Sequence, residues 1–127
     1  MGALTEIVMH LARNPKAGFP EGDAHRGYRI VAPLDATGRL DVALWREKKA
    51  LCTVNRFSPD EAELADGWLS HRGSHWYFRY DEEEEGPDEP LFRLGDHVLR
   101  VGEYVTVTEE GEEPLVYRVT ETSPYRG

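Results

Sequence analysis

Apolar and polar residues alternate along several short segments of the chain, which is the pattern of strands that bury one face. The clearest of these segments are 27–35 (GYRIVAPLD), 75–80 (HWYFRY), 103–108 (EYVTVT) and 115–120 (LVYRVT). We expect two further strands at 51–57 and 68–71. A tight turn at residues 72–74 would join 68–71 to 75–80 as a hairpin.

The first apolar segment, 5–13 (TEIVMHLAR), fits the spacing of either a helix or a strand. Its β-branched residues, and its early end before Pro15, favour the strand. In the segment 27–35, Pro33 cannot donate a backbone hydrogen bond, so this strand should lie at a sheet edge or end there. We expect the C-terminal residues TSPYRG to be frayed.

One short helix is expected over Asp41–Ala50, with Asp41 as its N-cap. Leu44, Trp45 and Leu51 would form its apolar face. Ser58-Pro59 is a second helix-start signal, but Gly67 turns the chain soon afterwards, so one helical turn is expected there.

About seven strands at short spacing with a single short helix predict a mainly β fold. Parallel sheets need helical crossovers, and this chain has no room for them. We therefore expect an antiparallel β-barrel or sandwich of six to eight strands. The length of 127 residues predicts a single domain spanning residues 1–127.

The net charge of -9 is unevenly distributed along the chain. Residues 1–60 carry a net charge of +2, whereas residues 61–127 carry -11. Such asymmetry steers partners and can favour self-association. Nucleic acid is an unlikely partner because phosphate contacts need a clustered basic face, and no such cluster occurs.

No targeting or membrane-spanning segment is expected. The apolar run near the N-terminus is interrupted by Glu6 and His10 and has no basic residues ahead of it. No stretch approaches the ~20 apolar residues that cross a bilayer. The single cysteine, Cys52, excludes an internal disulfide and suits a reducing cytoplasm. We expect a cytoplasmic protein without a membrane partner.

The most informative stretch is 75–97, HWYFRY-DEEEEGPDEP-LFRLGDH, in which aromatic segments flank an acidic linker. It predicts a β-hairpin with concentrated negative charge at its tip. The linker does not match a calcium-binding loop, since Phe92 stands where a bidentate Glu is required. A solvated loop that protects the sheet edge and a docking site for a basic protein surface are the two interpretations. The docking hypothesis names Tyr77, Glu82, Glu83, Glu84 and Glu85 as contact residues.

Three histidines could assemble near the base of this hairpin. His71 and His75 form an H-x3-H pair, and in one of two strand registers His75 would face His97. Together with Asp96 they could bind zinc, which takes nitrogen and oxygen ligands. This spacing is diagnostic on a helix but not across a turn, so partly buried histidines with local hydrogen bonds are the plainer interpretation.

No phosphate-binding loop or nucleophile motif occurs, and no motif requires a cofactor. Cys52 lies in an apolar context and is expected to be an inert core residue. Six aromatic residues could line a ligand pocket at a barrel mouth, or they could be ordinary core residues and cross-strand pairs. They are Trp68, Trp76, Tyr77, Phe78, Tyr80 and Phe92.

The combination of GYRIVAPLD, a short helix containing Trp-Arg, GDH followed by GEYVTV, and a C-terminal YRV resembles a set of short bacterial proteins of unknown function. The resemblance covers most of the chain. It implies a bacterial cytoplasmic protein, but no activity and no functional residues. The leading functional hypothesis is a non-catalytic binding module that docks a protein partner. The alternatives are a small metal-dependent enzyme and a small-molecule binder.

Overall fold

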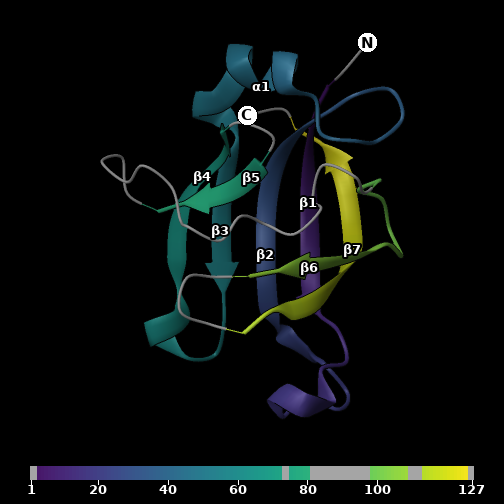
Figure 1. Ribbon diagram of the computed structural model, residues 1–127, viewed down its shortest axis with the longest axis vertical. Helices are drawn as coiled ribbons and strands as arrows, with labels where there is room; N and C mark the ends of the chain where they lie inside the picture. Colours follow the sequence, from purple (N-terminus) through teal and green to yellow (C-terminus); the bar gives the residue numbers. More distant parts are fainter. Residues whose placement is uncertain (1–2, 73–74, 81–97, 109–112, 126–127) are drawn as a thin grey trace.

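The computed structural model describes residues 3–72, 75–80, 98–108 and 113–125 (Figure 1). Its strands are β1 (Ala3–Leu11), β2 (Asp23–Leu34), β3 (Thr53–Phe57), β4 (Ala65–Arg72), β5 (His75–Arg79), β6 (Tyr104–Val107) and β7 (Leu115–Pro124). Its helical elements are α1 (Val42–Lys48) and three 3-10 turns, η1 (Pro15–Ala17), η2 (Lys49–Leu51) and η3 (Glu61–Glu63). Every strand expected within the described residues is present, and the segment 5–13 is the strand β1, as predicted. The second arm of the hairpin expected over 75–97 lies outside the described residues.

The seven strands form one antiparallel sheet in the order β5-β4-β3-β2-β1-β7-β6. The sheet curls into a half-barrel, with β5 crossing in front of β3 and β6 crossing in front of β2 and β1 (Figure 1). The curvature brings distant strands together around Tyr28 of β2, which is fully buried. Its ring centre lies 4.9 Å from that of Phe78 in β5 and 5.0 Å from that of Tyr117 in β7. The prediction of a mainly β, antiparallel fold with one short helix is confirmed.

The core fills the concave side of the half-barrel, and the alternation in the sequence explains which residues form it. Residues at every second position of the long strands point inward. The buried apolar side chains include Ile7, Met9, Leu11, Tyr28, Ile30, Ala32, Val54, Leu69, Trp76, Phe78, Val105, Val107, Tyr117 and Val119.

β1 lies in the middle of the sheet, paired with β2 on one side and β7 on the other. The expectation of a frayed C-terminal segment is wrong for its first residues. Thr122–Pro124 continue β7 and pair with Thr5–Ile7 of β1. The Tyr125 amide also donates to the Leu4 carbonyl oxygen at 3.1 Å. Backbone pairing with a central strand outweighs the weak strand propensity of the sequence TSPY.

Pro33 is the residue before the last one of β2. The hydrogen-bonded pairing between β2 and β3 explains why proline is tolerated at this position. β2 pairs with β3 only through Gly27–Ile30. Beyond Ile30 the β3 side of β2 has no strand partner among the described residues. The strand ends at Leu34, which agrees with the prediction that it would end near Pro33.

Gly27 is required by a close backbone approach between β1 and β2. The register shifts between His10, which pairs with Gly27, and Leu11, which pairs with Asp23, so the extra residues 24–26 belong to β2. A Cβ atom at position 27 would lie 1.8 Å from the Met9 carbonyl oxygen and 2.8 Å from Cζ of Phe57. Only glycine fits there without moving the backbone.

The helix α1 begins as predicted, with an Asp41 carboxylate oxygen accepting a hydrogen bond from the Leu44 amide at 3.2 Å. Leu44 and Trp45 are half-buried, but Leu51 is 39% exposed, so the expected apolar face is wrong at that residue. The 3-10 turn η2 ends the helix before Leu51 can reach the same face. No helix in the described ranges is long and apolar enough to cross a membrane.

The predicted helical turn after Ser58-Pro59 is η3, and it is capped by a different residue. The Asp60 carboxylate accepts from the Ala62 amide at 3.0 Å. Ser58 instead donates its hydroxyl to the Glu63 carboxylate at 2.9 Å. The turn therefore begins two residues later than the Ser-Pro signal indicated.

Candidate functional site

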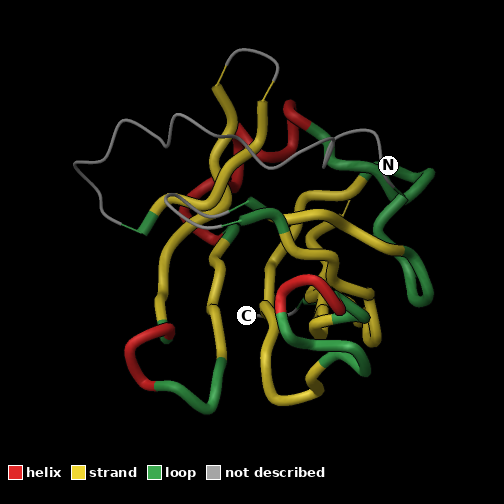
Figure 2. Tube along the Cα trace, turned by 60° about the horizontal axis from the view of Figure 1, so that its bottom comes forward, coloured by secondary structure: helices red, strands yellow, loops and turns green. Residues whose placement is uncertain are grey.

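The predicted site residues that the structure describes lie in the β4–β5 hairpin. His71 of β4 is half-buried and opposes Trp76 in the ladder. Its ring centre lies 4.7 Å from that of Trp76 and 5.9 Å from that of Trp45 in α1. Figure 2 shows α1 beside this hairpin. His71 is thus part of an aromatic cluster between the helix and the hairpin.

The remaining histidines are not fully described. The backbone of His75 pairs with Arg72 in the β4–β5 ladder, but its side chain and all of His97 lie outside the described residues. The described residues contain no group of three or more side chains suited to hold a metal ion. The three-histidine zinc site therefore stays a prediction. Glu82, Glu83, Glu84 and Glu85 also lie outside the described residues, so the acidic docking site stays a prediction too.

Tyr77 is described, and its position follows the predicted alternation. Its neighbours Trp76 and Phe78 are 5% and 3% exposed and belong to the core. Tyr77 is half-exposed on the opposite face of β5, where it opposes Ser70 of β4. An aromatic ring with a polar tip in this setting is suited to contact a ligand or partner.

Tyr77 lines a groove of about 560 Å³ beside α1, which we name the tryptophan groove. The described residues that line it are Trp45, Lys49, Ala50, Trp68, Leu69, Ser70, His71, Tyr77 and Arg79. His71 and Tyr77, two of the residues singled out in the sequence, are therefore brought together in one site.

The groove exists because β4 extends beyond the start of β3. Thr53, the first residue of β3, pairs with Trp68 of β4. The next β4 residue, Leu69, donates its amide to the Cys52 carbonyl oxygen at 2.8 Å and accepts the Trp45 Nε1 hydrogen at 2.8 Å. A helix side chain thus takes the place of a strand at this edge and leaves space beside it.

Two cations stack on the aromatic rings of the tryptophan groove. The guanidinium carbon of Arg79 lies 5.5 Å from the ring centre of Trp68, and Lys49 Nζ lies 5.8 Å from that of Trp45. No carboxylate is among the described lining residues, and neither cation forms an ion pair with a described residue. The groove therefore combines positive charge with aromatic surface.

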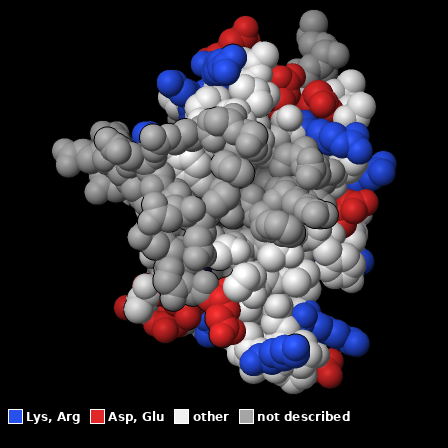
Figure 3. Space-filling model, in the orientation of Figure 1, with Lys and Arg blue, Asp and Glu red and all other residues white. Residues whose placement is uncertain are grey.

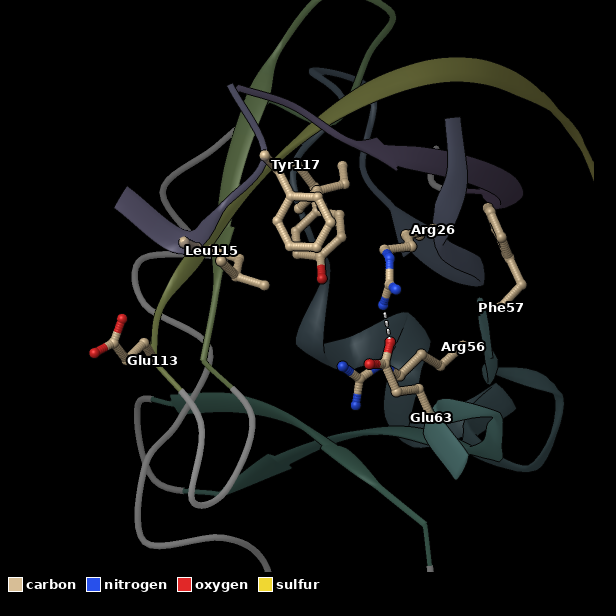
Figure 4. A pocket seen from close by; sticks show the side chains of 11 residues that line it. Arg26, Arg56, Phe57, Glu63, Glu113, Leu115 and Tyr117 are labelled. Atoms are coloured by element: carbon tan, nitrogen blue, oxygen red, sulfur yellow. Dashed lines mark hydrogen bonds and ion pairs between the residues drawn. The ribbon is translucent and has the colours of Figure 1, made fainter. Parts of the chain in front are cut away.

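A second cavity of about 330 Å³ lies at one end of the half-barrel, and we name it the barrel-end pocket (Figure 4). Its charges are largely compensated from within. Arg26 forms ion pairs with Asp23, at 3.1 Å, and with Glu63. In Figure 4 Arg56 lies beside Glu63, whereas Leu115 and Tyr117 form the opposite side. These contacts tie η3 to the start of β2, so we interpret the charged residues as structural.

A third hollow of about 580 Å³ is lined by residues of β1, β6 and β7 together with the loop before β2. His10 Nδ1 lies 2.7 Å from Thr120 Oγ1, and its ring contacts Phe57 edge-on at 5.6 Å. Its described lining includes two acids, Glu21 and Asp23, and two bases, Arg13 and Arg118, so it has no net preference for one charge.

Cys52 is unsuited to nucleophilic chemistry. It is fully buried, and burial raises the pKa of its thiol to about 11. Its Sγ donates to the Lys48 carbonyl oxygen at 3.4 Å. A thiol with a raised pKa remains protonated at neutral pH and does not attack.

The sequence did not reveal the tryptophan groove as a unit. Trp68 and Tyr77 were among the aromatic residues that the sequence offered as a possible pocket lining, but the docking of α1 against β4 is a long-range event with no local signal. No protein-family model matches the chain, and neither a curated protein nor a solved structure is significantly similar to it. The functional argument therefore rests on the sites themselves.

Proposed function

We propose that the protein is a non-catalytic binding module that docks a basic protein surface through its acidic segments. The observation that carries the proposal is how charge divides between the described framework and the rest of the chain. Residues 81–97 hold eight Asp and Glu and one Arg, and residues 109–112 hold three Glu and no base. The described residues hold thirteen acids and thirteen bases, so their net charge is zero.

On the face that Figure 3 shows, the described framework has no continuous acidic surface that would attract a basic partner. On the face shown in Figure 3, the described acidic and basic side chains are spread around the rim, and neither sign forms one continuous patch. The net charge of -9 belongs to the acidic segments, offset only by Arg126. A field that originates in two short segments directs a partner to them.

Both acidic segments follow the outermost described strands. β5 and β6 are the first and last strands of an antiparallel seven-stranded order, so they run in the same direction. Figure 1 shows both arrows pointing the same way. Residues 81–97 begin just after β5, and residues 109–112 begin just after β6. Both acidic segments therefore follow strands that run in the same direction, which is compatible with one partner contacting both.

Tyr77 would supply an aromatic anchor beside the charge. It lies in β5, a few residues before the first acidic segment, and is half-exposed. Tyrosine is enriched among the residues that dominate binding energy at interfaces, whereas charged residues at the rim mainly accelerate and orient association.

The test compares two variants that lose the same number of charges. One replaces Glu82, Glu83, Glu84 and Glu85 with Gln. The matched control replaces the exposed framework residues Glu21, Glu47, Glu61 and Glu121 with Gln. The wild-type chain captures proteins from cell extract at low salt, mass spectrometry identifies them, and calorimetry then measures each purified partner against all three chains.

We expect the acidic-segment variant to bind the partner about fourfold more weakly or worse, because exposed ion pairs contribute roughly 0.2–1 kcal/mol each. The control variant should bind like the wild type, and the wild-type affinity should fall as salt is added. Equal losses of affinity in both variants would mean that only the net charge of the chain matters, which would contradict a specific docking segment. An unchanged affinity in the variant with Gln at residues 82–85 would refute the proposal.

A further inference from the structure

The tryptophan groove contains a buried donor that has no acceptor. Nε of Arg79 is inaccessible to solvent and makes no hydrogen bond. Among the described residues it is the one buried side-chain nitrogen or oxygen in this condition. Buried polar groups are nearly always bonded, and an exception needs a physical reason such as a bound molecule.

A second polar group faces the same groove. Ser70 is only 7% exposed, lines the groove, and makes no side-chain hydrogen bond to the described part of the chain. Its hydroxyl can both donate and accept. Together with Nε of Arg79 it provides hydrogen-bonding groups that the described residues leave unused.

The two cations of the groove lie over aromatic rings and form no ion pair with the described residues. The guanidinium carbon of Arg79 lies 5.5 Å from the ring centre of Trp68, within the range of a cation–π contact. Lys49 is held over Trp45 in the same way. By contrast, Arg26 in the barrel-end pocket is already compensated by Asp23 and Glu63. Among the described residues, the cations of the tryptophan groove therefore lack the anionic partners that Arg26 has.

We infer that the tryptophan groove binds a small oxyanion carried on a planar ring, such as an aryl carboxylate or an aryl phosphate. The oxyanion would accept hydrogen bonds from Arg79 and form an ion pair with Lys49. The ring would pack against the aromatic walls formed by Trp45, Trp68 and Tyr77. The volume of about 560 Å³ lies within the range of small-molecule sites.

Tryptophan fluorescence provides the measurement, since two of the three tryptophans line the groove. The full chain is titrated separately with phenyl phosphate, benzoate, phenol and inorganic phosphate. We expect a saturable change with phenyl phosphate or benzoate, with a dissociation constant on the order of a millimolar or lower. Phenol, which lacks the anion, and inorganic phosphate, which lacks the ring, should bind roughly tenfold more weakly or not at all.

Variants locate the site. Arg79→Gln should weaken binding of the better probe by on the order of tenfold or more, because it removes a charge-assisted hydrogen bond. Lys49→Gln should weaken it several-fold, and Ser70→Ala to a similar extent. Arg100→Gln, at a side chain that is 71% exposed and distant from the groove residues in sequence, is the matched control and should bind like the wild type. Circular dichroism and the thermal midpoint confirm that each variant is folded.

The inference is overturned if neither ring-bearing anion saturates below about 10 mM, ten times the expected constant. It is also overturned if phenol binds as well as either anion, or if folded Lys49→Gln and Arg79→Gln variants bind like the wild type. Its failure is separable from that of the proposed function. The variant with Gln at residues 82–85 should retain the fluorescence response even though it loses partner binding.

Discussion

Tyr28 is the residue around which the half-barrel closes, and replacing it tests that arrangement directly. Its side chain is fully buried, and its ring contacts those of Phe78 and Tyr117, which belong to strands on either side of β2. The change Tyr28→Ala would remove the ring and leave a cavity bordered by three strands.

Truncation of a buried large aromatic side chain to alanine costs roughly 3–5 kcal/mol. The two ring pairs contribute about 0.5–1.5 kcal/mol each beyond the area they bury. We therefore expect the free energy of unfolding to fall by about 4 kcal/mol. A domain of this size has a total stability of roughly 5–15 kcal/mol, so the variant should be close to unfolding at room temperature.

Urea denaturation followed by circular dichroism measures this loss, provided that the m-value is unchanged. Tyr104→Ala is the matched control, since Tyr104 is 56% exposed and its loss should change stability by less than about 0.5 kcal/mol. A loss below about 1.5 kcal/mol for Tyr28→Ala would contradict this expectation, because removing a buried ring that contacts two other strands should destabilise the fold by more than that.

Three further changes probe local features. Gly27→Ala should lower the free energy of unfolding by about 2 kcal/mol or more, because its Cβ would meet the Met9 carbonyl oxygen at 1.8 Å; a urea midpoint within error of the wild type would contradict this. The Cys52 thiol has a pKa raised from 9.0 to about 11, so the stability that this shift provides is complete below pH 9 and lost as the pH rises toward 11. The urea midpoint of the wild type should thus fall more steeply over that range than that of Cys52→Ala. The pKa of Asp35 is lowered from 3.8, first by the Thr37 hydroxyl, so an NMR titration should find it below 3.8 and find it higher in Thr37→Val.

Local chemistry made most of the fold predictable. The alternation in 27–35, 103–108 and 115–120 located three strands, because half-burial imposes a period of two residues. The start of α1 was also predictable, because the Asp41 carboxylate and the Leu44 amide that it caps are only three residues apart. The predictions were wrong where contacts with residues far away in the sequence determine the local structure. The final residues of β7 are ordered by β1, more than a hundred residues away.

The candidate site was predictable only in part. Alternation alone separated Tyr77 from the core residues around it, and the structure agrees. The pairing of Arg79 with Trp68 required the register of the β4–β5 hairpin. The contribution of Trp45 and Lys49 required knowing where α1 packs. The groove is formed by the helical segment α1–η2 and the strands β4 and β5, so no local sequence pattern within one of these elements predicts it.

The central position of β1 has a consequence for the order in which the chain can fold. Its partner β7 is the last strand, and the side-chain hydrogen bond between Thr120 and the Val8 carbonyl oxygen spans 112 residues. Among the described strands, β6 pairs only with β7, although it precedes β7 in the sequence. During synthesis β1–β5 can pair as they emerge, but one side of β1 and the whole of β6 must wait for residues 115–124. Closing so long a loop is slow, so the nascent chain would present the unpaired edge of β1 to chaperones until its last strand is released.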